Sequence, residues 1–338
     1  MRFGRPGAGG LLFEWFDPMR ILALLNRDGG TLKTTDLDWL SALIRDEFAV
    51  HGHEVTVELC AGSDIVPAIK KAAATDDLDV LLVGGGDGTV SAAVGALYEG
   101  DTALAILPAG TMNLFARTLQ IPLDLEEAVK ALAGGRTTKV DVATVNGKPF
   151  VHQFATGLHA RMVRFRERIS YRSRLGKMWA TTRAIGLAFR RLPKVELVID
   201  VDGRSERLKC SALAISNNLY GDRHLPFADN PKGGQLGVYI CTERRLARVA
   251  KLTADIFAGQ WRKNPDLVVK SATRVDLAHR GKPRSNRAVR DGELEALDDL
   301  SRVEIHPLAL TVLVPAEATY LEQEVEVGSK PQVEAAAR

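Results

Sequence analysis

Hydrophobic positions in the first 135 residues follow two alternating patterns. Short apolar runs bounded by glycine or polar residues predict strands, whereas apolar residues that recur every three to four positions predict helices. The predicted strands are 21–25, 54–59, 80–83 and 104–107, and the predicted helices are 37–48, 65–73, 89–97 and 125–132. Thr35 and Asp38 have a spacing similar to a capping box at the start of the first helix. Alternating strands and helices are typical of a parallel sheet covered by helices.

Beyond Gly134-Gly135 the pattern changes to short strands with hairpin signals. The predicted strands are 140–145, 150–155, 195–201, 208–215, 236–241, 267–269, 303–306 and 310–314, and one helix is predicted at 246–257. Asn146-Gly147 and Asp202-Gly203 separate the first four of these strands into two hairpins, because such pairs favour tight two-residue turns. The second half is therefore predicted to be mostly antiparallel β-structure.

These patterns predict the fold class α/β plus mostly-β. An N-terminal α/β domain with a parallel sheet is expected at 20–138. A C-terminal, antiparallel β-rich domain is expected at 139–321, and its last strands can return to the first domain. Residues 1–19 are glycine-rich and are predicted to form a flexible arm, with a weak membrane contact as the alternative. Residues 322–338 are polar and alanine-rich and are predicted to be disordered.

Glycine-bearing loops follow three of the predicted strands in the first half. Gly84 to Thr89 follows the strand 80–83, Pro108 to Arg117 follows 104–107, and Asn26 to Thr31 follows 21–25. Ligands of open α/β sheets bind at the carboxyl ends of the strands, so these loops are expected to face one crevice. Backbone N–H groups of a loop with few side chains can approach phosphates, which favours a phosphate or nucleotide site. The alternative is a tight turn that uses glycine only for its backbone freedom.

Composition narrows the class of protein only slightly. A hydrophobic content of 46%, a charged content of 26% and a net charge of +3 are typical of a globular chain. Cys60, Cys210 and Cys241 are widely separated, which favours buried thiols of a reducing compartment over disulfides or a zinc site. No apolar run approaches the ~20 residues of a membrane span, and Glu14 interrupts the apolar N-terminal segment. We therefore expect a cytoplasmic protein.

Four segments follow one another along the chain: Asn26 to Thr31, Gly85-Gly86-Asp87-Gly88-Thr89, Gly110 to Arg117 and Asp291-Gly292-Glu293. Their order resembles that of the catalytic domain of the diacylglycerol kinase family, which includes sphingosine and ceramide kinases. The resemblance runs from about Arg20 to about Leu321. The second segment is shared with NAD kinases, and the third is more discriminating. The resemblance implies an ATP-dependent lipid kinase that uses Mg²⁺, with its active site in the interdomain cleft and, as is common in the family, a homodimer.

The resemblance also implies roles for individual residues. The implied contacts to ATP are Asn26, Thr31, Gly85, Gly86, Asp87, Gly88, Thr89, Gly110, Thr111 and Asn113. Among them, Asp87 has two open roles, because its carboxylate could orient the nucleotide or contact the metal. The stretch 226–236 has glycine where family members have an acidic residue that helps to hold a structural magnesium, so we assign no metal ligands.

Asp291 and Glu293 are the candidate catalytic residues. From the local sequence alone, Asp291-Gly292 is equally consistent with a simple hairpin turn. The resemblance implies that the carboxylate of Asp291 is the general base that accepts the proton of the acceptor hydroxyl. Glu293 points to the same side of an extended chain and could orient Asp291 or hold magnesium. Its alternative is a solvated strand residue.

The segment from Arg161 to Lys194 has eleven Lys or Arg residues and one acid, Glu167. Its apolar residues lie near one face of a helix, so an ordinary amphipathic helix with solvated arginines is one interpretation. The other is a surface for anionic lipid, to which each basic residue near the membrane contributes ~1 kcal/mol. We expect the second, with the protein peripherally associated with the inner face of the membrane. The motifs of nucleic-acid readers are absent, so no nucleic-acid partner is expected.

Three functions therefore stay open on the sequence alone. The first is a lipid kinase acting on a hydroxyl of diacylglycerol or of a ceramide or sphingoid lipid. The second is NAD kinase-like phosphorylation of a soluble dinucleotide, and the third is a catalytically silent protein that binds nucleotide or lipid. The segment Gly110 to Arg117, the late Asp291-Gly292-Glu293 and the basic stretch favour the first function, and the presence of Asp291 disfavours the third.

Overall fold

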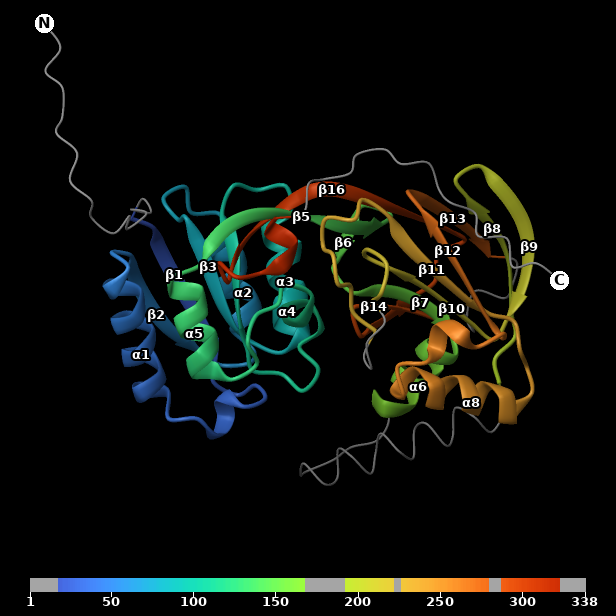
Figure 1. Ribbon diagram of the computed structural model, residues 1–338, viewed down its shortest axis with the longest axis horizontal. Coiled ribbons are helices and arrows are strands. Elements are labelled where there is room, and N and C mark those ends of the chain that lie inside the picture. The colour runs from blue at the N-terminus through green and yellow to red at the C-terminus, as the bar shows by residue number, and fades with distance from the viewer. Residues whose placement is uncertain (1–17, 168–191, 222–225, 280–286, 323–338) are drawn as a thin grey trace, which may run out of the picture.

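The computed structural model describes residues 18–167, 192–221, 226–279 and 287–322 (Figure 1). The remaining residues include most of the predicted N-terminal arm, the basic stretch between 168 and 191, and nearly all of the predicted C-terminal tail, so these predictions fall outside the described residues.

The first half of the chain is a parallel sheet covered by helices, as predicted. Its strands lie in the order β2-β1-β3-β4, and β3 and β4 are buried along their whole length because they lie in the middle of the sheet. Helix α1 packs beside α5, and α2 packs beside α3. The strands are β1 (Arg20–Asn26), β2 (Glu54–Cys60), β3 (Val80–Gly85) and β4 (Ala103–Pro108), and the helices are α1 (Leu37–Val50), α2 (Ile65–Ala73), α3 (Asp87–Leu97), α4 (Leu114–Thr118) and α5 (Leu125–Ala133).

The same sheet continues into the second half through the long strand β16 (Leu300–Val314), which arches over the molecule in Figure 1. Val312 pairs with Leu104 of β4, and the other end of β16 pairs with β13. A bulge between His306 and Leu310 lies where the sequence predicted two separate strands. The other strands of this part are β5 (Arg136–Val145), β6 (Lys148–Phe150), β8 (Val195–Val201), β9 (Arg204–Cys210) and β13 (Arg274–His279). The predicted domain boundary at 138/139 lies inside β5, which pairs with β16.

A second, antiparallel sheet completes the β-rich half, in the strand order β12-β11-β10-β7-β14-β15. Its buried face packs on the continued part of the first sheet around Phe150, Phe154 and Ile215. Its elements are β7 (Gln153–Gly157), β10 (Ala212–Ser216), β11 (Leu236–Cys241), β12 (Leu267–Ala272), β14 (Arg287–Arg290) and β15 (Glu293–Ala296), with the helices α6 (Leu158–Glu167) and α8 (Leu246–Phe257). The predicted fold class is confirmed.

Two predicted strands are each divided between the two sheets. The strand 150–155 was predicted as continuous, but β6 ends at Phe150 and β7 begins at Gln153. The strand 208–215 is likewise divided at Ser211, between β9 and β10. Both sheets bury apolar side chains in the common core, so the apolar pattern runs through the crossing points without a break. The prediction of single strands was therefore wrong.

The start of α1 also differs from the prediction. Asp36, not Thr35, is the N-cap, and its carboxylate accepts hydrogen bonds from the N–H groups of Asp38 and Trp39. The hydroxyl of Thr35 instead donates to the carbonyl of Thr31. A capping box requires the acid three residues after the cap, and the true cap has Trp39 at that position.

Replacing Asp36 by alanine is expected to lower the free energy of unfolding by ~1 kcal/mol, the usual cost of losing an N-cap. Urea unfolding followed by circular dichroism measures this change. Thr35→Ala is the matched control, because it removes one exposed hydroxyl bond and leaves the cap intact. A larger loss for Thr35→Ala than for Asp36→Ala would contradict the assignment.

All three cysteines are buried and free, as the sequence predicted. None of the helices in the described part of the chain is both long and apolar enough to cross a bilayer.

Candidate active site

Three loops meet at the carboxyl ends of β1, β3 and β4. The N–H of Thr31 donates to the carbonyl of Ala109 over 2.8 Å, which joins the first loop to the third. Gly30 has a φ of +45°, and a Cβ built on it would lie 1.7 Å from the oxygen of Ala109. A Cβ on Gly110 would lie 2.7 Å from the Cα of Gly86. The glycines are therefore required for backbone-to-backbone packing of the loops, and not only for a turn.

Asp87 and Asn113 shape these loops through their side chains. The carboxylate of Asp87 accepts hydrogen bonds from the N–H groups of Leu114, at 2.7 Å, and Asn113, at 3.1 Å. Asn113 has a φ of +50°, and its amide accepts from the N–H of Gly110 and donates to the carbonyl of the same residue. Both residues thus hold the third loop against the second. This geometry gives Asp87 a structural role that the sequence did not predict.

The N-terminus of α3 lies at the centre of the loops. Its N-cap is Gly86, and no side chain caps it. The first N–H groups of a helix have no intrahelical acceptor and carry a partial positive charge, so they can bind an anion such as a phosphate. Thr89 is buried behind Gly85, whereas Gly88 and Thr111 are exposed. The amide oxygen of Asn26 accepts from the N–H of Asp28 and so holds the first loop.

Asp291 lies in a two-residue turn between β14 and β15. Asp291 and Gly292 have φ values of +46° and +89°, as a tight hairpin turn of this kind requires, and Arg290 pairs with Glu293. The hairpin interpretation is therefore correct, and the turn also faces α3 of the other half. Ser91 of α3 donates to the carboxylate of Asp291 at 3.3 Å.

The carboxylate of Asp291 is fully engaged. One oxygen accepts from the N–H groups of His152 and Gln153, at 2.9 and 3.1 Å, and the other accepts from Val151 at 2.9 Å and from Ser91. These three N–H groups come from the segment where the chain passes from β6 to β7. Burial raises the pKa of Asp291, and the three backbone hydrogen bonds act in the opposite direction. Four donors occupy the four lone-pair positions of a carboxylate, so its main observed role is to join three segments.

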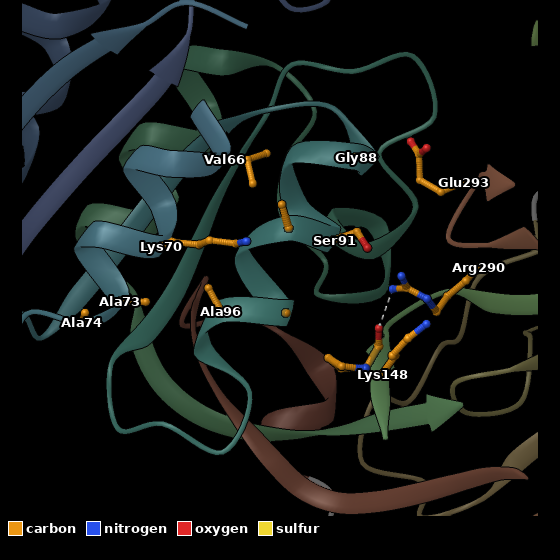
Figure 2. A pocket seen from close by; sticks show the side chains of 13 residues that line it. Val66, Lys70, Ala73, Ala74, Gly88, Ser91, Ala96, Lys148, Arg290 and Glu293 are labelled. Carbon is orange, nitrogen blue, oxygen red and sulfur yellow. Dashed lines mark hydrogen bonds between the residues drawn. The ribbon is translucent and has the colours of Figure 1, made fainter. Parts of the chain in front are cut away.

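Glu293, by contrast, is one of the lining residues of a cavity of about 680 Å³ between the two halves, and in Figure 2 its carboxylate lies level with Gly88. Its carboxylate is exposed, and a Cβ built on Gly88 would lie 3.9 Å from its Oε1. No hydrogen bond from Glu293 to Asp291 is seen, so the structure offers no support for the prediction that Glu293 orients Asp291. The cavity is lined by α2, α3, β6 and the hairpin β14–β15; its polar lining residues are Lys70, Ser91, Lys148, Arg290 and Glu293.

Sequence reasoning missed Lys70, Ser91, Lys148 and Arg290 as residues of this cavity. Arg290 is the first residue of the segment Arg290-Asp291-Gly292-Glu293 and could have been included on that ground. It donates to the carbonyl of Pro149 at 3.1 Å and lies 3.4 Å from the carboxylate of Glu295. Lys148 follows a turn and Lys70 lies in the last turn of α2, so neither position has a local sequence signal for function.

The stretch 226–236, where the family's acidic residue is replaced by glycine, is anchored by Asp141. The buried carboxylate of Asp141 accepts from the N–H of Gly234 and from the amide of Asn218, both at 2.7 Å, and from the N–H of Leu308 at 3.0 Å. Among the described residues, no group of three or more His, Cys, Asp or Glu side chains is placed to hold a metal ion.

Comparison with known proteins agrees with this architecture. Residues 20–145 match the model of the diacylglycerol kinase catalytic domain, and residues 153–314 match that of the YegS C-terminal NAD kinase beta sandwich-like domain. A diacylglycerol kinase of Staphylococcus carnosus is 24% identical over 62% of this chain and 69% of its own length. A diacylglycerol kinase of Staphylococcus aureus (strain JH9) is 27% identical over 60% of this chain and 65% of its own length.

Solved structures show the same fold. Two crystal structures from Bacillus anthracis str. Sterne superimpose with TM-scores of 0.68, at 21% identity, and 0.63, at 18% identity. Each covers 89% of this chain, and 99% and 98% of the respective solved chains are covered. The second of them is named a diacylglycerol kinase. Motifs, sheet topology and both matched domains agree, and the chain therefore belongs to the family of proteins built on the diacylglycerol kinase catalytic domain.

Proposed function

We propose that the protein is an ATP-dependent lipid kinase that transfers the γ-phosphate of ATP to a hydroxyl group of a membrane lipid, either diacylglycerol or a ceramide or sphingoid lipid. The observation that carries the proposal is one continuous cavity, which begins at the uncapped N-terminus of α3 and is bordered by Glu293. Phosphoryl transfer needs a phosphate cradle, positive charge around the phosphates and a group that takes the acceptor proton, and this cavity offers all three.

The nucleotide fits this cavity in one orientation. Its phosphates would lie at the N–H groups of Gly86 to Gly88, and its nucleoside would lie along α3, where Ala92, Gly95 and Ala96 leave room for a flat base. A volume of about 680 Å³ is within the range of small-molecule sites. Lys148 and Arg290 line the cavity from the β-rich half, below Ser91 in Figure 2, and their positive charges can offset negative charge on the phosphates.

Glu293 is the better placed of the two acids to accept the proton of the lipid hydroxyl. Its carboxylate is exposed at the cavity beside Gly88, whereas the carboxylate of Asp291 already accepts four hydrogen bonds. We assign proton acceptance to Glu293, and to Asp291 the positioning of the hairpin that presents it. A base needs a free lone pair within reach of the hydroxyl before its pKa matters.

Mg²⁺ usually binds nucleotide phosphates together with one or two protein carboxylates. Glu293 is the carboxylate that lines the cavity, and Asp87 precedes the lining residue Gly88 in the chain. When bound, the ion would neutralise charge on the phosphates during transfer.

The names of the relatives and the basic residues around α6 support a lipid acceptor at an anionic membrane surface. The test is transfer of labelled γ-phosphate from ATP and Mg²⁺ to micellar diacylglycerol, ceramide, sphingosine and undecaprenol, with NAD as the soluble acceptor. We expect one lipid to be labelled by the wild type, and Glu293→Gln to lower that rate by about 100-fold or more, the usual contribution of a positioned base.

The description of the second domain as NAD kinase beta sandwich-like favours one alternative, phosphorylation of a soluble dinucleotide. Labelling of NAD without labelling of any lipid would establish that alternative. If ATP binds but no acceptor is labelled, the protein is a silent nucleotide-binding member, and the kinase proposal fails.

A further inference from the structure

A second cavity, of about 310 Å³, lies in the β-rich half away from the nucleotide cavity. It is bordered by the end of β7, by α6, by the start of β8 and by Arg287 of β14. Arg287 and Arg290 are the first and last residues of β14, so the two cavities lie at opposite ends of this strand, about 10 Å apart at the usual rise of a strand. The hairpin turn that contains Asp291 follows the Arg290 end of β14.

The lining of this second cavity is strongly cationic. Its charged residues are Arg161, Arg164, Lys194 and Arg287, and none of its described lining residues is acidic. Lys194 also lies 3.9 Å from the carboxylate of Glu196, at an exposed position where such a pair contributes little. Like charges that converge on one concave surface repel one another, and a bound anion would offset this repulsion.

One donor in this group is buried without an acceptor. The Nε of Arg164 has no hydrogen-bond partner among the residues that the structure describes. Leaving a buried donor without an acceptor is unfavourable, so a ligand oxygen that reached Nε would stabilise the complex. This observation is independent of the net charge of the lining, and it indicates a ligand that carries hydrogen-bond acceptors.

We propose that this cavity binds a phosphate group, carried either by a soluble phosphomonoester or by the headgroup of a phospholipid. Three of the four cations are arginines, whose planar guanidinium groups pair with two phosphate oxygens at once. The cavity is larger than a phosphate ion and so leaves room for the group that carries it. Arg161 and Lys194 are the two ends of the basic stretch that the sequence predicted to be a surface for anionic lipid.

The test uses the full chain and needs no kinase activity, so it is independent of the proposed function. Binding of inorganic phosphate and of glycerol 3-phosphate is measured by isothermal titration calorimetry. Binding to vesicles of phosphatidylcholine, with and without phosphatidic acid, is measured by sedimentation. The variant is Arg164→Gln combined with Arg287→Gln. The matched control is Arg207→Gln, which removes one exposed positive charge from β9 in the same half of the chain.

We expect the double variant to lose about tenfold or more in affinity, because two guanidinium groups that can donate to the phosphate are removed, and Arg207→Gln to change it little. Loss of saturable binding of the soluble phosphates identifies a free phosphomonoester as the ligand. Loss confined to vesicles with phosphatidic acid identifies a lipid headgroup. The proposal is overturned if the wild type binds neither probe, or if the double variant binds as the wild type does. If the double variant does not fold, Arg287→Gln alone is compared with the wild type in the same binding measurements, because Arg287 is exposed.

Discussion

Replacing Gly110 by alanine is expected to lower the affinity for ATP by about 100-fold, the size of effect that a misplacement of ~1 Å can have in a preorganised site. The new Cβ would lie 2.7 Å from the Cα of Gly86 and 2.7 Å from the amide oxygen of Asn113. The first of these atoms is backbone and cannot rotate away. The second loop must therefore move from the third, and the N–H groups at the start of α3 move with it. Isothermal titration with ATP measures the loss.

Gly233→Ala is the matched control for this prediction. A Cβ at Gly233 would lie 3.5 Å from the nearest side-chain atom, Nδ2 of Asn218, which is an ordinary contact distance. We expect its affinity for ATP to match that of the wild type. Unchanged ATP binding in Gly110→Ala, with a normal thermal midpoint, would show that the phosphates bind elsewhere.

The sequence was sufficient for the elements that depend on local periodicity. The strands around the glycine loops, α8, and the hairpin at Asp202-Gly203 all follow from apolar spacing and turn residues that act within a few positions. The convergence of three loops could also be predicted, because carboxyl ends of parallel strands share one edge of the sheet. These features need no knowledge of contacts between distant residues.

The features that could not be predicted depend on contacts between distant segments. The division of 150–155 into β6 and β7 arises from N–H groups that bind Asp291, about 140 residues later in the chain. The hydrogen bonds from the N–H groups of residues 113 and 114 to the carboxylate of Asp87 likewise join two separate loops. Lys70 and Lys148 line the same cavity only because two halves of the chain face each other. A local pattern contains no information about such pairings.

The roles of the two acids of the hairpin can be separated by two matched substitutions, Asp291→Asn and Glu293→Gln. Asparagine at 291 retains one acceptor oxygen, but its NH₂ group would face backbone N–H donors. Because a buried donor without an acceptor costs ~1–3 kcal/mol, we expect a fall in the free energy of unfolding of about 2 kcal/mol. At this chain length that corresponds to roughly 3 °C in Tm. Its kcat should fall as well, because the hairpin that presents Glu293 is displaced.

Glu293→Gln is expected to lower kcat without lowering the stability of the fold. Its side chain is exposed and has no hydrogen-bond partner to lose in the described part of the chain, so Tm and the affinity for ATP without Mg²⁺ should be nearly unchanged. Its kcat should fall by about 100-fold or more, because an amide cannot accept the proton of the lipid hydroxyl. Thermal unfolding, ATP titration and the kinase assay on both variants decide the assignment. If Asp291→Asn loses kcat without a change in Tm while Glu293→Gln stays active, Asp291 is the base, as the family resemblance implied, and the four hydrogen bonds it accepts must rearrange when the acceptor binds.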